Sequence, residues 1–258
     1  MLEISELKSY YSTKLQSHPR FILREYLQYK ILEIIYSLKI SNNLVFLGGT
    51  CLRLVYGNKR FSEDLDFDNF NLSQKQFTEM RDKITYQLER EGYKIDTRVV
   101  LRAAWHCYIK FPKLLYELGL SDHPNETLLI QIDTEPHHFK YDPNRKILNK
   151  LDIFTTVLTV PLSIVLSQKI YAVLNRPRSK GRDFFDIVFL LGKNVLPNFD
   201  YLKEKVSISN MAELKKNILE KCDEIDMNIM AEDVEPFLFE QKDKKRVLQF
   251  ENYIKQEF

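Results

Sequence analysis

The clearest pattern in the chain is a pair of short apolar runs around a glycine turn, within Leu44–Phe70. Residues 44–47 are all apolar, and Gly48, Gly49 and Thr50 follow directly. An apolar-periodic segment opens at that turn, and residues 64–68 then alternate acidic with apolar side chains. This pattern predicts a strand, a tight turn into a helix, and a second strand that carries the acids.

The remaining pattern predicts further helices and strands on both sides of this stretch. Helical periodicity indicates one or two amphipathic helices in the first forty residues and another from Ser73 to Glu91, and runs of Val, Ile and Tyr indicate strands at residues 94–101, 104–111 and 128–133. Residues 140–150 are polar and rich in turn formers, and the pattern beyond Pro161 is helical. We therefore expect an α/β fold, with a mixed sheet of four or five strands in residues 1–150 and a helical half in residues 151–258.

Composition narrows the class of protein only moderately. The chain has 258 residues and a formal net charge of +2, which is too small to identify a nucleic-acid binder. No apolar run approaches the length that crosses a bilayer, and the amino terminus lacks a signal pattern, so we expect no membrane association. Three widely spaced cysteines fit a reducing compartment, and the cytoplasm is the expected location.

The alternating acids are the first candidate for chemistry. On a strand, Asp64 and Asp66 project from one face while Leu65 and Phe67 project from the other. Two carboxylates side by side repel each other, and a divalent cation relieves that repulsion. Oxygen ligands favour Mg²⁺, with Mn²⁺ as an alternative. Asp68 continues the same face only if the strand extends that far.

The glycine turn is the second candidate. The turn of Gly48, Gly49 and Thr50 allows backbone N–H groups to approach an anion, and the helix that follows directs its positive end toward the same place. A turn of this kind beside two metal-binding carboxylates predicts a site for a metal-bound nucleoside triphosphate. The alternative for both features is an ordinary solvated turn.

These residues resemble the AbiEii-type nucleotidyltransferases, which are toxins of the DNA polymerase beta-like superfamily. The resemblance rests on Gly-Gly-Thr, thirteen further residues and then Asp-Leu-Asp, with Arg60 and Ser62 just before it in RFSEDLDF. It implies that Arg60 and Ser62 help to bind the nucleotide. It also implies a third carboxylate from a neighbouring strand, for which Asp133 at the end of LLIQID is our candidate and Glu135 the competitor.

A second block of the chain carries the same resemblance. In PLSIVLSQKIYAVLNRPRSKGRDFFDIVFLL, a lysine on one helix is followed by a basic loop and an Arg-Asp-x-x-Asp helix. Lys169 would supply a point charge to the triphosphate and Arg182 a planar donor, while Asp183 and Asp186 would share one helical face. We expect Lys169 and Asp183 to act in catalysis and Arg182 and Asp186 in nucleotide binding. The alternative for Asp183 is a helix-starting acid, and the alternative for Asp186 is a structural ion pair with Lys169 or Arg182.

Several other conspicuous residues are expected to be structural. Cys51 is more simply a small helix residue than a nucleophile, and Trp105 and His106 are expected to belong to the sheet. His137 and His138 have no partner at ligand spacing, so we expect loop residues there. The basic loop is different, because it could guide a nucleic-acid acceptor through Arg176, Arg178 and Lys180.

The resemblance implies transfer of a nucleoside monophosphate from a nucleoside triphosphate to an acceptor hydroxyl. RNA, such as the tRNA 3′ end, is the expected acceptor, and an antitoxin encoded nearby is the expected partner. Two alternatives remain at this point. The same fold could move a phosphoryl group or modify a protein or small molecule, and a non-catalytic protein could bind a nucleotide or partner without reaction.

Overall fold

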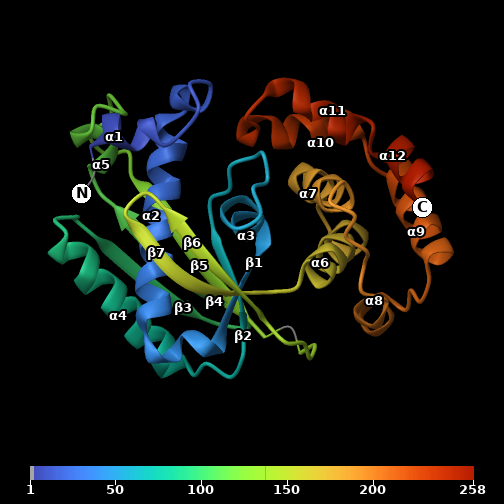
Figure 1. The fold of residues 1–258 in the computed structure, drawn as a ribbon, viewed down its shortest axis with the longest axis horizontal. Coiled ribbons are helices and arrows are strands. Elements are labelled where there is room, and N and C mark those ends of the chain that lie inside the picture. Colours follow the sequence, from blue (N-terminus) through green and yellow to red (C-terminus); the bar gives the residue numbers. More distant parts are fainter. Residues whose placement is uncertain (1–2, 137) are drawn as a thin grey trace. The chain divides into compact units, whose positions relative to one another are not determined.

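The computed structural model describes residues 3–136 and 138–258, and it divides the chain into two compact units. Unit 1 comprises residues 1–56, 62–138 and 143–159, and unit 2 comprises residues 57–61, 139–142 and 160–258 (Figure 1). The prediction for His137 falls outside the described residues. The sequence placed the boundary at residue 150, whereas the sheet of unit 1 continues to Thr159.

Unit 1 is built on one mixed sheet of seven strands in the order β3-β4-β5-β2-β1-β7-β6. Its strands are β1 (Leu44–Leu47), β2 (Leu65–Asn69), β3 (Asp96–Leu101), β4 (Trp105–Phe111), β5 (Leu128–Glu135), β6 (Asn144–Lys150) and β7 (Ile153–Thr159). Five of these strands match the runs predicted from the sequence. The β6–β7 hairpin was not predicted, and it adds two strands at one edge of the sheet.

The central strands place the predicted acids by their pairing. β2 pairs antiparallel with β1 and parallel with β5, and Asp66 lies in register with Asp133. Asp68 lies within β2 and is buried, so the strand extends beyond the second acid. On the opposite face, Leu65 and Phe67 are buried in the main hydrophobic core.

The helices of unit 1 are α1 (Ile4–Ser9), α2 (Pro19–Ser37), α3 (Gly48–Leu54), α4 (Gln74–Arg90) and α5 (Leu114–Glu117). The long helix α2 is buried along most of its length and contributes Tyr36, whose ring packs near Phe67 of the sheet. Helix α4 is capped at its amino end by Ser73, the predicted start, through a capping box that Gln76 completes. Helix α3 starts at Gly48 itself, so the glycine turn forms the first turn of the helix.

Unit 2 is helical, as predicted for the second half of the chain. Its α-helices are α6 (Leu162–Asn175), α7 (Gly181–Leu191), α8 (Phe199–Val206), α9 (Met211–Asp223), α10 (Met227–Val234), α11 (Lys245–Leu248) and α12 (Phe250–Glu257). Helix α7 packs against α6, α10 and α12, and the rings of Phe184 and Phe250 meet edge to face at 4.9 Å.

A short segment from the first half of the chain, called the excursion below, belongs to unit 2. Between α3 and β2, residues 57–61 belong to unit 2, where Arg60 forms an isolated antiparallel bridge with Leu238. The Phe61 N–H donates to the carbonyl of Phe237 at 2.8 Å, and the Phe61 ring lies 4.7 Å from that of Phe239. The sequence between the glycine turn and the acids therefore has a structural role in the helical unit.

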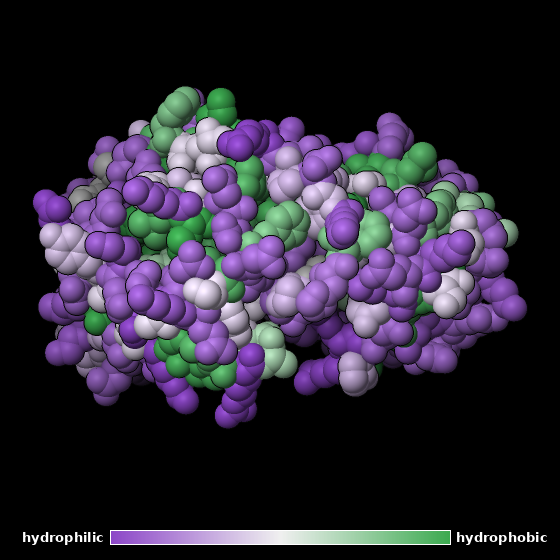
Figure 2. All heavy atoms as spheres, turned by 90° about the horizontal axis from the view of Figure 1, so that it is seen from below, coloured by the Kyte–Doolittle hydropathy of each residue, from purple (hydrophilic) through white to green (hydrophobic). Residues whose placement is uncertain are grey.

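The surface carries no continuous apolar belt on the face that Figure 2 shows, where hydrophilic side chains predominate and hydrophobic ones form separate patches. Within residues 3–136 and 138–258, no helix combines the length and the apolar character that spanning a membrane requires.

Candidate active site

In unit 1, the carboxylate of Asp66 lies directly against the first turn of α3. A Cβ atom at Gly48 would come within 2.1 Å of Asp66 Oδ2, so only glycine leaves room for this approach. Gly48 also has φ of +78°, a backbone conformation that side chains disfavour. The predicted meeting of the acid strand and the glycine turn is thus present in the structure.

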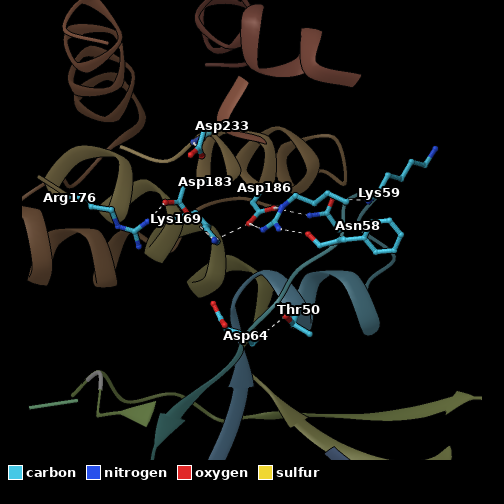
Figure 3. Close-up of polar contacts among 12 residues, drawn as sticks. Thr50, Asn58, Lys59, Asp64, Lys169, Arg176, Asp183, Asp186 and Asp233 are labelled. Atoms are coloured by element: carbon cyan, nitrogen blue, oxygen red, sulfur yellow. Dashed lines mark hydrogen bonds and ion pairs between the residues drawn. The ribbon is translucent and has the colours of Figure 1, made fainter. Parts of the chain in front are cut away.

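Thr50 links the same turn to the other acid. Its hydroxyl donates a hydrogen bond to the backbone carbonyl of Asp64, and its side chain is fully buried (Figure 3). The hydroxyl is therefore used to fix the turn to the acid strand. The groups that could bind an anion at this turn are the first-turn N–H groups of α3, because they have no intrahelical acceptor.

Ser62 and Cys51 are both buried beside this region. The Ser62 carbonyl accepts a hydrogen bond from Gln28 Nε2 at 3.1 Å. This bond links the segment before β2 to helix α2. Burial and the nearby Asp66 carboxylate raise the pKa of the Cys51 thiol well above its usual range. A thiol held protonated in this way is a packing group, as expected from the sequence.

Asp133 is the third predicted acid, and its carboxylate is held by two side chains. Its Oδ1 lies 2.7 Å from His106 Nδ1 and 2.7 Å from Gln131 Nε2, and its Oδ2 lies 2.9 Å from the same Gln131 nitrogen. Since Asp133 pairs with Asp66 in register, the two acids share one face of the sheet. Glu135, the competing candidate, is exposed and lies in register with Asp68.

The donor set of Asp64, Asp66 and Asp133 fits a hard cation in chemistry, because all its side-chain donors are carboxylate oxygens. Among the residues that the structure describes, however, no group of three or more His, Cys, Asp or Glu side chains is arranged to hold a metal ion. Asp64 lies directly before β2, and Asp66 and Asp133 lie in register on neighbouring strands, but the three acids do not form a closed cage by themselves.

In unit 2, the predicted residues form an ion cluster that is largely buried except at Arg176, whose side chain is 38% exposed (Figure 3). Asp186 accepts from Arg60 at 2.7 Å through both of its carboxylate oxygens, and Lys169 Nζ lies 2.9 Å from Asp186 Oδ2. Lys169 also contacts Asp183 at 2.8 Å, and Asp183 contacts Arg176 at 2.7 Å. Three cations and two anions leave the cluster with one net positive charge.

Burial disfavours the charged form of Asp186, but the charges of Arg60 and Lys169 outweigh it and lower the pKa of Asp186 to about 2. Burial likewise opposes the charge of Lys169, while Asp183 and Asp186 raise the pKa of its ammonium group. Both groups are therefore ionised at neutral pH.

Arg60 and Asp186, two predicted nucleotide contacts, are 1% and 0% exposed and form an ion pair within unit 2. Their contact with a nucleotide stays a prediction from the sequence. Asn58 adds a third donor to Asp186 at 2.8 Å, which the sequence pattern did not indicate. Arg182 lies on α7 with its guanidinium 4.7 Å from the ring centre of Phe237.

The basic segments of unit 2 differ in how much of their charge is neutralised locally. Arg176 is paired with Asp183, whereas Arg178 and Lys180 are exposed. In the block at residues 242–246, Lys242, Lys244 and Arg246 each pair with a nearby acid. Arg178 and Lys180 thus remain the better candidates for guiding an anionic acceptor.

A Gly48→Ala variant tests the close approach of Asp66. We expect the free energy of unfolding to fall by about 1–2 kcal/mol from the strained φ alone, and further because the Asp66 carboxylate must move. Gly92→Ala is the matched control, since Gly92 has φ of +91° with no atom within 4 Å of an added Cβ. Urea unfolding that gives equal losses for the two variants would contradict the close approach.

Similarities to known proteins extend over most of the chain. Residues 31–253 match a family model described as "Nucleotidyl transferase AbiEii toxin, Type IV TA system". The fold is similar to the crystal structure of JHP933 from Helicobacter pylori, with a TM-score of 0.56 and 16% identity over 92% of this chain and 91% of that one. It is also similar to a crystal structure of a proposed nucleotidyltransferase from H. pylori, with a TM-score of 0.57 and 17% identity over 92% and 93% of the two chains. A search of curated proteins gave no match.

Proposed function

Because this chain belongs to the AbiEii nucleotidyltransferase toxin family, we propose that it transfers a nucleoside monophosphate from a nucleoside triphosphate to a hydroxyl group of RNA, such as the tRNA 3′ end. Family membership makes the chain a nucleotidyltransferase of the toxin–antitoxin type and implies a cognate antitoxin. The observation that carries the proposal for the site is the Asp66 carboxylate packed against Gly48, which places an acid beside a turn suited to phosphate.

In the proposed reaction, the acceptor oxygen forms a bond to the α-phosphorus of the triphosphate. The bond from that phosphorus to the oxygen bridging to the β-phosphate breaks, and pyrophosphate leaves. The acceptor hydroxyl loses its proton to Asp133, the acid on the strand next to β2. The N–H groups of Gly48 and Gly49 bind the polyphosphate, because the start of α3 favours negative charge.

We propose that the reaction depends on Mg²⁺, with Mn²⁺ as a substitute, held by Asp64 and Asp66 and completed by Asp133. The carboxylate donors support this proposal, although the three acids form no closed cage by themselves. When bound, the ion would neutralise charge on the polyphosphate and on the leaving group. Lys169 lies in unit 2 and is ionised, and its contact with the triphosphate stays a prediction from the sequence.

Incubation with total RNA and each α-labelled triphosphate in turn tests the proposal. We expect label in RNA with at least one nucleotide. We expect no label when EDTA is present or when the Asp66→Asn variant is used in place of the unsubstituted protein. Label in a protein or small-molecule fraction alone would favour the alternative acceptors. A lack of transfer to any acceptor, combined with nucleotide-induced thermal stabilisation that Mg²⁺ does not change, would favour a binding role without catalysis.

A further inference from the structure

Across three neighbouring strands, one row of residues carries chemistry that the sequence did not connect. Asp66 on β2 is in register with Asp133 on β5, and Asp133 is in register with His106 on β4. Residues in register on adjacent strands project from the same face of the sheet. His106 therefore belongs to the same row as the two predicted acids.

The contact between His106 and Asp133 is short and directional. The distance from Nδ1 to Oδ1 is 2.7 Å, which suits an N–H donor and a carboxylate acceptor. Either the imidazolium or the neutral ring with its proton on Nδ1 donates this bond, so the contact does not depend on the charge of His106. The two side chains are 29% and 28% exposed, which leaves room for a ligand beside them.

The pattern of donors around Asp133 is asymmetric. Oδ1 accepts from both His106 and Gln131, whereas Oδ2 accepts from Gln131. A carboxylate oxygen has two lone-pair positions, so the bonds to Oδ1 occupy both and the bond to Oδ2 occupies one. The carboxylate is thereby fixed in rotation, with Oδ2 as the oxygen that can still bind a cation or accept a proton.

The strand that carries His106 is itself held on both sides. β4 pairs with β3 through residues 105–110 and with β5 through all of its seven residues. Directly before His106, Trp105 packs its ring 5.7 Å from that of Phe77 on α4. Tyr108, two residues further along the same face, has its ring 6.2 Å from the His106 ring. The imidazole therefore lies on a strand that pairs with a neighbour on each side.

We propose that His106 is a positioning residue for the transfer reaction, which sets the orientation of the Asp133 carboxylate toward a divalent cation. This inference rests on the proposed function. A hydrogen-bond partner behind a ligating carboxylate fixes its geometry, and loss of such a partner typically weakens metal binding about 10- to 100-fold. A His–Asp pair that only stabilised the sheet would leave metal binding unchanged.

The test uses the full chain, Mn²⁺ and electron paramagnetic resonance, which reports free Mn²⁺ without any need for turnover. We expect His106→Phe, which lacks the donor, to weaken the apparent Mn²⁺ affinity about 10- to 100-fold. His106→Asn presents an amide nitrogen close to the position of Nδ1 and is expected to retain most of the affinity. Tyr108→Phe is the matched control on the same face of β4 and is expected to bind as the unsubstituted protein does.

The outcomes separate this inference from the proposed function. Unchanged Mn²⁺ affinity in His106→Phe, with affinity lost in Asp66→Asn, overturns the role of His106 and leaves the proposed function standing. Equal losses in His106→Phe and His106→Asn also overturn it, because the donor would then be irrelevant. If Asp66→Asn itself binds Mn²⁺ and transfers nucleotide normally, the proposed function fails. Should His106→Phe not fold by circular dichroism, His106→Ala takes its place with the same expected loss.

Discussion

An Asp66→Asn variant is expected to lose nucleotidyl transfer by about 10³-fold, which corresponds to roughly 4 kcal/mol of barrier, while it remains folded. The substitution removes the negative charge and one strong oxygen ligand but keeps the shape of the side chain. The carboxylate lies against the first turn of α3, where the polyphosphate is proposed to bind. Its negative charge would there hold the divalent cation that neutralises the polyphosphate. The measurement is single-turnover transfer of labelled nucleotide to RNA.

The matched control for this variant is Glu135→Gln. Glu135 is an exposed acid at the end of β5, two residues beyond Asp133 and on the same face of the strand. We expect its transfer rate to stay within about threefold of that of the unsubstituted protein, since the residue is in register with Asp68 rather than with Asp66. Comparable losses in the two variants would mean that the reaction responds to general negative charge and not to the acid at the glycine turn.

An Asp186→Asn variant is expected to lower the free energy of unfolding by about 3–5 kcal/mol. The carboxylate neutralises Arg60 and Lys169 and accepts from Asn58, and the substitution leaves these buried cations with too little negative charge. Urea unfolding followed by circular dichroism measures the effect. Glu220→Gln is the control, because Glu220 forms an exposed pair with Lys216 and is expected to change stability by less than about 0.5 kcal/mol.

The same variant has a defined pH signature. The pKa of Asp186 is lowered from 3.8 to about 2 in the folded protein, so the associated stability is complete above pH 4 and is lost as the pH falls toward 2. This shift corresponds to roughly 2 kcal/mol. The difference in unfolding free energy between the unsubstituted protein and Asp186→Asn should therefore shrink by about that amount between pH 4 and pH 2. A constant difference over this range would show that charge on Asp186 is not the cause.

Local patterns were enough to predict much of unit 1. The glycine turn, the alternating acids on β2 and the capped start of α4 are each encoded within a few residues, so the sequence reveals them directly. The β6–β7 hairpin was missed because β6 reads as a polar linker. In this edge strand Leu148 is the one buried residue, so alternation of polar and apolar positions is weak.

Contacts between residues that lie far apart in the sequence were harder to predict. The contact of His106 with Asp133 depends on the register between β4 and β5, and a single sequence does not specify that register. Asp186 was expected to pair with Lys169 or Arg182 if its role was structural. The structure retains Lys169 and adds Arg60, which comes from an excursion 126 residues earlier in the chain.

That excursion has a consequence for dissecting the protein. Residues 57–61 belong to unit 2 but leave and re-enter unit 1 on either side, so no single peptide bond separates the two units. A fragment starting at Val160 would retain Asp186 and lack the guanidinium that binds it. Independent production of the helical half should therefore require a grafted copy of residues 57–61, and a plain truncation is expected to be poorly folded.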